Sequence, residues 1–191
     1  MTKKMFGLIL VAVLIAIVIT GFVKENIDEE DPFADEQLGV DQVGIAANEG
    51  LNKGEQPPDF ELTTLAGDQV RLSELKGKKV ILNFWATWCP PCKAEMPHMQ
   101  NFYEDYAKNE NVEILAINLT GSVSVETVEE FVEDYGLTFP IPMDKEGTIG
   151  QKYQAITIPT SYFIDTEGKI QHKVVGPMDE NMIQDFVSNI N

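Results

Sequence analysis

The chain has 191 residues, of which 43% are hydrophobic, and it carries 31 acidic against 14 basic side chains for a net charge of -17. A length of this order allows one domain with short additions and excludes a large multidomain enzyme. Arg71 is the only arginine, so no basic stripe is available to neutralise phosphates, and nucleic acid is excluded as a partner. The two cysteines are too few for a disulfide framework or for a four-ligand zinc site.

The chain begins with an apolar segment. Met5–Val23 is a run of 19 residues without a charge, and at about 1.5 Å per residue a helix of that length covers close to the ~30 Å core of a bilayer. Lys3 and Lys4 precede the run and acidic residues follow it, so the positive-inside rule places the N-terminus in the cytoplasm and the rest outside. A cleaved signal peptide is the alternative, but its apolar region is normally about 7 to 15 residues long. We predict a retained single-pass anchor over residues 1–24.

An acidic stretch separates this anchor from the rest of the chain. Residues 25–52 hold nine acids and no base, with too few apolar side chains to offset the entropy of ordering. We predict a flexible linker here, with docking of the short apolar patches 38–43 and 45–47 on a partner as the alternative. The remaining residues, 53–191, are numerous enough to bury a core of their own.

Residues 53–191 show alternating strand and helix patterns. In chain order they first predict a hairpin of residues 60–62 and 70–72 joined by a glycine turn, and a buried strand over 79–85. A helix follows with Pro91 in its first turn; its apolar residues recur at helical spacing from Lys93 to about Lys108, and Pro97 should kink it. Next come a buried strand over 112–118, a helix over 124–135 with Ser124 as N-cap and Gly136 as terminator, a short helix over 148–153, strands over 160–164 and 169–175, and a helix over 179–190 capped by Asp179. Strands alternating with helices indicate an α/β sheet flanked by helices.

A Cys-x-x-Cys pair lies where the first buried strand meets the next helix. Such a pair points its first sulfur at unpaired backbone N–H groups and at the positive end of the helix dipole, and both favour the thiolate. We therefore predict that Cys89 is a nucleophile and that Cys92, one turn into the helix, resolves the mixed disulfide. Two unreactive thiols or half of a metal site are the alternatives. Since only His98 and His172 could add imidazole ligands, we expect neither a metal nor a cofactor.

The sequence around this pair resembles a known family. The run Phe84–Pro97, with its two tryptophans and its Cys-Pro-Pro-Cys motif, together with the later Ile-Pro-Thr at 158–160, resembles the thioredoxin superfamily. Within it, residues 53–191 look like the membrane-anchored extracytoplasmic oxidoreductases of the TlpA and ResA type. The resemblance implies an α/β thioredoxin fold with an N-terminal β-hairpin and a central strand-helix insertion between Val112 and Asp144, preceded by a single transmembrane helix.

The same resemblance implies a substrate-binding surface. Pro159 would be a cis-proline facing the disulfide, although the residues alone favour trans, because only about 5 to 6% of X-Pro bonds are cis. Ile158 would then offer its backbone to an extended substrate. Trp88 and Pro90, on either side of Cys89, would complete the surface.

Two residues depart from ordinary thioredoxin. Asn83 stands where thioredoxin has a buried acid, and an amide cannot exchange protons. Glu95 lies three residues after Cys92, so both project from roughly the same helical face. A partly buried carboxylate there would have a raised pKa and would move protons to and from Cys92, as the glutamate of the ResA-type group does. A solvated surface glutamate beside Lys93 is the alternative.

The resemblance also implies a direction of electron flow. Cys89 would attack disulfides in extracytoplasmic proteins as a reductant, and an integral membrane thiol carrier would recharge the oxidised pair. The family's targets are the haem-binding cysteines of apo-cytochrome c, with spore-envelope assembly as a second role. We expect a monomer.

Three alternative functions share parts of this pattern. A thiol oxidase or isomerase would carry the same motifs but a higher reduction potential. A peroxiredoxin-like peroxidase would have proline and threonine where Leu82 and Ala86 stand, with an arginine near its cysteine. A copper-delivery metallochaperone would use Cys89, Cys92 and His172, but that family spaces its cysteines one residue wider.

Overall fold

The computed structural model describes residues 49–119, 121 and 123–190. In chain order its elements are β1 (Glu61–Thr63), β2 (Gln69–Arg71), the 3-10 turn η1 (Leu72–Leu75), β3 (Lys79–Trp85), α2 (Pro90–Phe102), the π turn η2 (Tyr103–Ala107), β4 (Val112–Asn118), α3 (Val125–Tyr135), α4 (Thr148–Lys152), β5 (Thr160–Ile164), β6 (Ile170–Val175) and α5 (Glu180–Ser188). The predicted anchor lies outside these residues, as does the linker up to residue 48. No helix among the described residues is long and apolar enough to cross a membrane.

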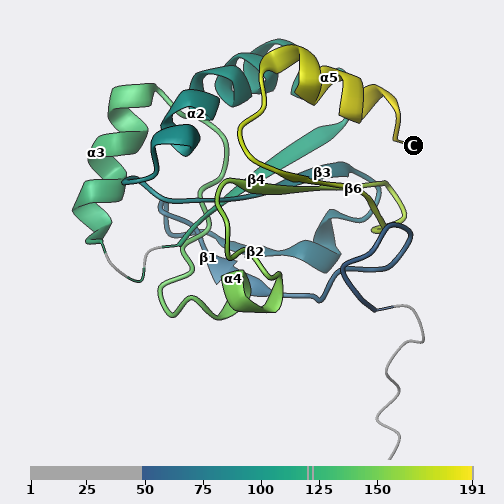
Figure 1. Ribbon diagram of the computed structural model, residues 1–191, viewed down its shortest axis with the longest axis horizontal. Helices are drawn as coiled ribbons and strands as arrows, with labels where there is room; N and C mark the ends of the chain where they lie inside the picture. The colour runs from purple at the N-terminus through teal and green to yellow at the C-terminus, as the bar shows by residue number, and fades with distance from the viewer. Residues whose placement is uncertain (1–48, 120, 122, 191) are drawn as a thin grey trace, which may run out of the picture. The chain divides into compact units, whose positions relative to one another are not determined.

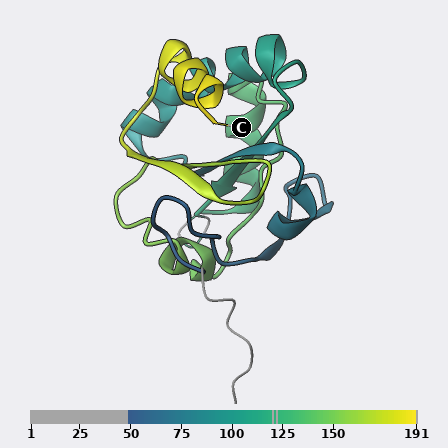
Figure 2. The same cartoon turned by 90° about the vertical axis from the view of Figure 1, so that its right-hand side faces the viewer.

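A four-stranded sheet in the order β4-β3-β5-β6 forms the centre of this part of the chain. Strand β3 pairs in parallel with β4 and antiparallel with β5, and β5 pairs antiparallel with β6. Helices α2, α3 and α5 cover one face, while the β1–β2 hairpin and α4 cover the other (Figures 1 and 2). The predicted α/β architecture, with its N-terminal hairpin, is confirmed.

Both faces of the sheet are buried because β3 is apolar on both sides. Its side chains alternate between two core clusters, as the two-residue period of a strand requires. The face under α2, called the α2 face below, holds among others Ile81, Trp85, Cys92, Met96 and Phe163. The opposite face, called the tyrosine face, holds among others Phe60, Leu82, Phe84, Tyr153 and Tyr162.

Helix caps confirm the predicted boundaries of α3 and of the start of α5. Ser124 Oγ accepts the Thr127 N–H at 3.3 Å, and Gly136 ends α3 with φ of 60°, a left-handed conformation that glycine adopts without a Cβ penalty. Asp179 caps α5 by accepting the Met182 N–H at 2.8 Å. The predicted strand and helix between Val112 and Asp144 are present as β4 and α3.

The helix after the cysteine motif differs from its prediction at its C-terminal end. It begins at Pro90, in agreement with the prediction that Pro91 lies in its first turn, where a proline loses no hydrogen bond. Past Phe102 the α-helical pattern widens into the π turn η2, which ends at Ala107. The helix continues through Pro97, and the predicted kink there stays a prediction. Helix α5 ends at Ser188, two residues earlier than predicted.

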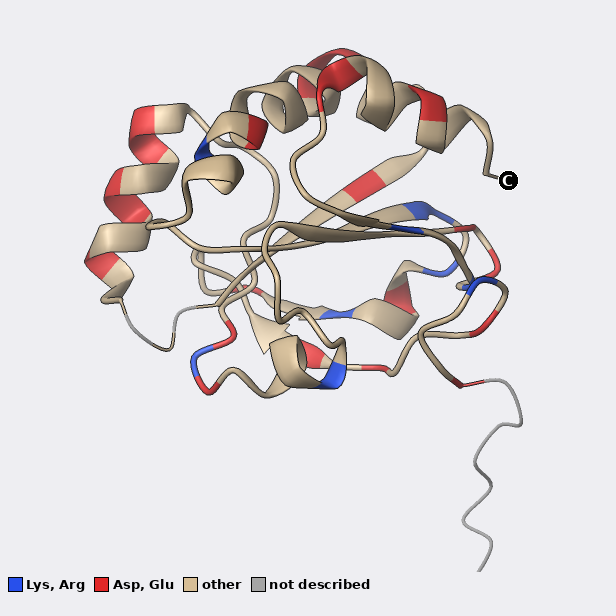
Figure 3. Cartoon of the chain, in the orientation of Figure 1, with Lys and Arg blue, Asp and Glu red and all other residues tan. Residues whose placement is uncertain are grey.

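In the part of the chain that the structure describes, acidic residues are frequent along α3 (Figure 3). Helix α3 alone exposes five acidic side chains and no basic one: Glu126, Glu129, Glu130, Glu133 and Asp134. Among the described residues only three acidic side chains are buried, namely Glu95, Asp144 and Asp165. Asp165 accepts several hydrogen bonds, two of them from the backbone of the turn after β5, and Asp144 accepts the Gly150 N–H. Glu95 is the one that lies beside the cysteine motif.

Candidate active site

The Cys-x-x-Cys pair closes a disulfide at the N-terminus of α2. Cys89 is the N-cap residue of the helix, and its Sγ accepts the backbone N–H of Cys92 at 3.3 Å. Its side chain is 3% exposed, whereas Cys92 is fully buried. Once the disulfide is reduced, a sulfur at this position faces the unpaired N–H groups of the first turn and the positive end of the helix dipole. Cys89 is therefore the sulfur placed to form a thiolate.

The loop before β5 brings a proline against this pair. The Ile158–Pro159 peptide bond is cis, which confirms the prediction. The Ile158 carbonyl oxygen lies 3.6 Å from Cys89 Sγ. Two hydrogen bonds hold the loop: Gly176 N–H donates to the Pro159 carbonyl at 2.9 Å and Thr160 Oγ1 donates to the Thr157 carbonyl at 2.6 Å. Proline offers no N–H here, so nothing on it competes with the hydrogen bonds of an approaching backbone.

Exposed apolar side chains adjoin Cys89 in the chain and lie near the cis-proline loop. Trp88, predicted as a substrate contact, is 58% exposed beside Cys89, and Pro90 on its other side is also exposed. Sequence reasoning missed Ile156 and Val175, which are 93% and 57% exposed. Ile156 precedes the cis bond in the same loop, and Val175 pairs with Thr160 across the β5–β6 ladder.

Glu95 is buried beneath the pair rather than solvated at the surface. It lies on α2 one turn after Cys92 and is 0% exposed. Its Oε2 accepts the Asn83 Nδ2–H at 3.2 Å, and its Oε1 accepts the Met178 backbone N–H at 3.3 Å. The alternative of a solvated glutamate beside Lys93 is therefore wrong.

Burial controls the protonation of this carboxyl. Loss of hydration raises the pKa of Glu95 from 4.5 to about 7, and the hydrogen bonds from Asn83 and Met178 offset only part of that rise. A group with a pKa of about 7 is half protonated at neutral pH. Glu95 can thus either accept or donate a proton under physiological conditions.

Asn83 and Ser161 complete the buried polar group on the α2 face. They pair directly across the β3–β5 ladder, and Asn83 Nδ2 donates to Ser161 Oγ at 2.9 Å. Both residues are fully buried. Sequence reasoning identified Asn83 but missed Ser161, because their contact depends on a strand register that joins residues 78 positions apart.

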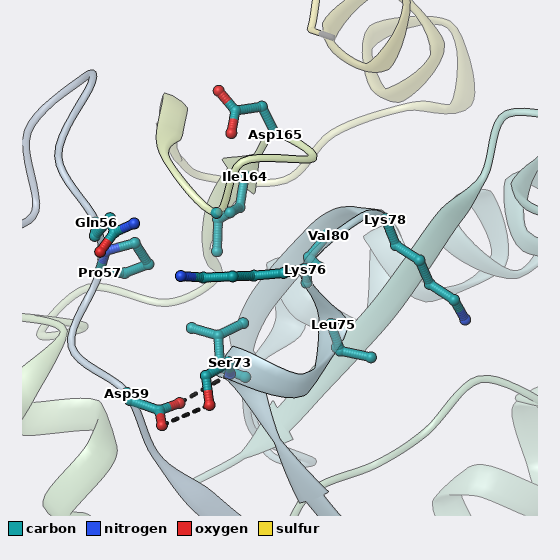
Figure 4. A pocket seen from close by; sticks show the side chains of 12 residues that line it. Gln56, Pro57, Asp59, Ser73, Leu75, Lys76, Lys78, Val80, Ile164 and Asp165 are labelled. Atoms are coloured by element: carbon teal, nitrogen blue, oxygen red, sulfur yellow. Dashed lines mark hydrogen bonds between the residues drawn. The ribbon is translucent and has the colours of Figure 1, made fainter.

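A pocket at the opposite end of the strands is not part of this site. Figure 4 shows its lining, which includes Lys76, Val80 and Ile164. The Asp59 carboxylate accepts two hydrogen bonds from Ser73, at 2.9 Å from the backbone N–H and 2.8 Å from the hydroxyl (Figure 4). None of the residues predicted for the active site lines this pocket.

The arginine that a peroxidase would need and the histidine that a copper-delivery protein would use have other partners in the structure. Arg71 is on β2, where it pairs with Asp59, Glu61 and Glu74. His172 packs against aromatic rings of β5 and α5. Within the described part of the chain, no three His, Cys, Asp or Glu side chains are grouped so that they could hold a metal ion.

Known proteins share both the sequence and the fold. Residues 53–173 match the AhpC/TSA family. The thiol-disulfide oxidoreductase ResA of Oceanobacillus iheyensis is 43% identical over 141 residues, which make up 72% of this chain and 72% of the relative. ResA of Bacillus subtilis is 40% identical over 146 residues, or 76% of this chain and 80% of the relative. The crystal structure of StoA from Bacillus subtilis superposes with a TM-score of 0.61 at 37% identity, covering 68% of this chain and 96% of StoA.

These relatives share the thioredoxin-like domain in which the cysteine pair lies. Their identity extends over more than two thirds of the chain, and the pair itself forms the disulfide that such a reaction requires. The chain therefore belongs to the AhpC/TSA family and, within it, to the thioredoxin-like thiol-disulfide oxidoreductases of the ResA type.

Proposed function

We propose that the chain is a reductant of disulfides in partner proteins outside the cytoplasm, with Glu95 as the proton carrier of the cysteine pair. One observation carries this proposal above the others. A fully buried carboxyl with a pKa of about 7 lies one helical turn beyond the buried cysteine of the disulfide. A buried carboxyl at that position is neutral once it has taken up a proton, so it needs no counter-charge in that state. Its pKa lies near neutral pH, as the pKa of a general acid or base should.

Reduction proceeds by two exchanges. The Cys89 thiolate attacks one sulfur of the substrate disulfide, so a bond forms between Cys89 and that sulfur while the other sulfur leaves as a thiolate. Cys92 then attacks Cys89 Sγ, the Cys89–Cys92 disulfide forms, and the second substrate sulfur leaves. Two electrons pass from the cysteine pair to the substrate. An external dithiol must return them before the next cycle.

Glu95 serves the second exchange. A buried Cys92 reacts slowly as a thiol, because the thiolate is the nucleophile and burial without a counter-charge opposes its formation. When Glu95 is ionised, it takes the proton of Cys92 and leaves the sulfur free to attack. When the pair is reduced again, protonated Glu95 returns the proton. Glu95 is thus the acid and the base of the same sulfur.

Substrate binding uses the loop of the cis-proline. The Ile158 backbone, next to Cys89, is positioned to pair with an extended segment around the target disulfide. Trp88 and Pro90 flank the segment and supply apolar contact. The partners that fit the family resemblance are apo-cytochrome c and proteins of the spore envelope, and the electron donor is an integral membrane thiol carrier. The single anchor over residues 1–24 would hold the domain, as a monomer, beside that donor.

The reduction potential of the Cys89–Cys92 pair tests the direction. Full-length protein is equilibrated with a thiol buffer, and the fraction oxidised is measured at each buffer ratio. A reductant has a potential below roughly -220 mV, toward the thioredoxin value near ~-270 mV. A potential near the ~-120 mV of a strong oxidant would overturn the proposal and make the chain a thiol oxidase or isomerase.

Trapping of partners tests the order of the two exchanges. A Cys92→Ser variant can form the first mixed disulfide but cannot resolve it, so partner proteins stay attached through Cys89. The matched Cys89→Ser variant should trap none. Equal trapping by both variants would contradict the assignment of Cys89 as the nucleophile.

A further inference from the structure

Three buried side chains on the α2 face form one hydrogen-bonded group. The Asn83 amide nitrogen donates both to Glu95 Oε2 at 3.2 Å and to Ser161 Oγ at 2.9 Å. All three residues are 0% exposed. The other end of the same amide, Asn83 Oδ1, is buried without a hydrogen-bond partner among the described residues. No hydrogen bond to Oδ1 therefore fixes the amide in one orientation.

The arrangement suits only one protonation state of Glu95. An ionised carboxylate only accepts hydrogen bonds, and both of its oxygens receive a donor here, from Asn83 and from the Met178 backbone. A protonated carboxyl carries an O–H that needs an acceptor. Backbone N–H cannot become an acceptor, so Oε1 stays opposite a donor in both states. The proton is therefore best placed on Oε2, where the carboxyl O–H and the Asn83 amide N–H would be two donors facing each other.

Asn83 holds the acceptor that this proton needs. A half turn of its amide exchanges Nδ2 and Oδ1 and presents an oxygen to Glu95. The terminal torsion of asparagine is broad and roughly two-fold, so both orientations are accessible. Ser161 does not oppose the turn, because a hydroxyl accepts from an N–H in one orientation and donates to an oxygen in the other.

We propose that Asn83 is a positioning residue whose side-chain amide reverses when Glu95 gains or loses its proton. With the amide nitrogen toward Glu95 the carboxylate is stabilised, and with the amide oxygen toward Glu95 the carboxylic acid is stabilised. The reversal bonds both states of the carboxyl, as a group that accepts a proton in one step and returns it in another requires. The significance for turnover rests on the proposed function of Glu95, whereas the reversal itself does not.

Few other groups face the carboxyl. On α2 it follows the disulfide cysteines, which do not titrate while oxidised. From β3 and β5 it meets the amide and hydroxyl just described, and from the segment before α5 it meets the Met178 backbone. No charged side chain contributes to its pKa among the described residues. Any change of Asn83 that follows the titration of Glu95 thus reports a direct contact.

NMR of oxidised full-length protein tests the reversal without a mutation. The protein is labelled with ¹⁵N-asparagine, and the side-chain amide protons of Asn83 are assigned through bonds. Above the titration midpoint of Glu95 these protons should show nuclear Overhauser contacts to the Ser161 β-protons. Below the midpoint the contacts should be lost. Contacts that persist unchanged on both sides of the midpoint would overturn the proposal.

Two variants separate the reversal from other causes. In Glu95→Gln the contacts between Asn83 and Ser161 should no longer depend on pH, and a remaining titration would assign the change to another group and refute the proposal. In Asn83→Leu, which keeps a similar volume without polar atoms, the donor to the carboxylate and the acceptor for the carboxylic acid are lost together, so the Glu95 midpoint should move by much less than one pH unit. A rise of about one pH unit would show that Asn83 is a fixed donor to the carboxylate and would refute the reversal.

Ser161→Ala provides a milder version if Asn83→Leu does not fold. It keeps the Asn83 amide, whose protons should still show contacts to the β-methyl group at position 161 above the Glu95 midpoint and lose them below it. Contacts that do not depend on pH would contradict the proposal. The proposed function fails separately: if Glu95→Gln leaves the pH profile of thiol exchange unchanged, Glu95 does not carry the Cys92 proton, yet Asn83 would still reverse in the oxidised wild-type protein.

Discussion

The two faces of the central sheet bury polar atoms in opposite ways. On the tyrosine face, Tyr162 Oη donates to the Tyr153 carbonyl at 2.6 Å, and Tyr153 Oη donates to the Pro58 carbonyl at 2.5 Å. Burial, reinforced by the nearby carboxylate of Asp59, raises the pKa of Tyr153 far above neutral, so it stays protonated and bonded. On the α2 face, Glu95 titrates at about 7.

This difference separates structure from chemistry within one small core. A buried polar group whose neutral form has a fixed acceptor holds one conformation and contributes stability. A buried acid that is balanced between two charge states costs stability but can move a proton at neutral pH. Substitutions on the α2 face should therefore change reactivity and its pH dependence, whereas substitutions on the tyrosine face should change stability alone.

Cys89→Ser should give the largest effect, namely a loss of thiol reactivity without a loss of the fold. The remaining sulfur, Cys92, is fully buried, so reaction of the reduced protein with an aromatic disulfide reagent should fall to the uncatalysed rate. The fold should remain, because residues 53–191 are held by a core rather than by the disulfide. Stopped-flow absorbance measures the rate, and circular dichroism checks the fold. A rate close to wild type would identify Cys92 as the entry point instead.

Phe84→Ala should produce the reverse pattern on the tyrosine face. The Phe84 ring is fully buried and contacts the rings of Tyr153 and Tyr162. Removing it should cost about 3 to 5 kcal/mol of unfolding free energy, through lost burial and a cavity. Urea unfolding measures the cost. The reduction potential of the cysteine pair in the folded protein should not change, and a large shift in potential would mean that the two faces are coupled.

Glu95→Gln should remove a pH dependence of the unfolding free energy. This dependence comes from the α2 face and has no counterpart on the tyrosine face. The native pKa of Glu95 is raised from 4.5 to about 7, so the native state binds more protons than the unfolded state between these values, and wild-type stability falls as pH rises through this window. The loss is about 3 kcal/mol for this group, and the variant should lack it. Urea unfolding of both oxidised proteins below about pH 5 and above about pH 8 gives the difference.

Comparing Glu95→Gln with the wild type is its own control, because every other titrating group contributes equally to the pH dependence of stability in both proteins. A wild-type stability that falls no more steeply with pH than that of Glu95→Gln would show that Glu95 is ionised in the native protein well below neutral pH. In the reduced protein the same variant should exchange more slowly at neutral pH, since Cys92 then lacks a proton acceptor.

Local sequence signals predicted the elements and two of the three residues of the buried polar group, Asn83 and Glu95. The cap residues Ser124 and Asp179 act on donors within three positions, so helix boundaries could be placed from the sequence. Glu95 could be found because one helical turn joins it to Cys92. Ser161 could not, because its contact with Asn83 is made by the register of β3 against β5.

The C-terminal end of α2 shows another feature that the sequence could not predict. The helical spacing of apolar residues predicted one continuous helix to about Lys108, yet the last turn widens to a π turn over Tyr103–Ala107. Tertiary contacts compete with the local pattern there. Tyr103 donates its hydroxyl to Glu113 on β4, and its ring packs edge-on against Phe139. Such contacts join residues far apart in the sequence, so the spacing of apolar residues along the helix does not predict them.

Tyr162→Phe should have the smallest effect, and it tests the contrast most narrowly. It removes one hydroxyl, leaves the ring in place, and deprives the Tyr153 carbonyl of the 2.6 Å hydrogen bond. An unsatisfied buried acceptor costs about 1 to 3 kcal/mol, and the aromatic contacts that remain favour the lower end. Because the substitution removes a hydroxyl and changes no charge, the cost should be the same at about pH 5 and about pH 8. A cost that changed with pH in parallel with Glu95 would mean that a proton on the α2 face alters the packing of the tyrosine face, and the sheet would then transmit charge state between its two sides.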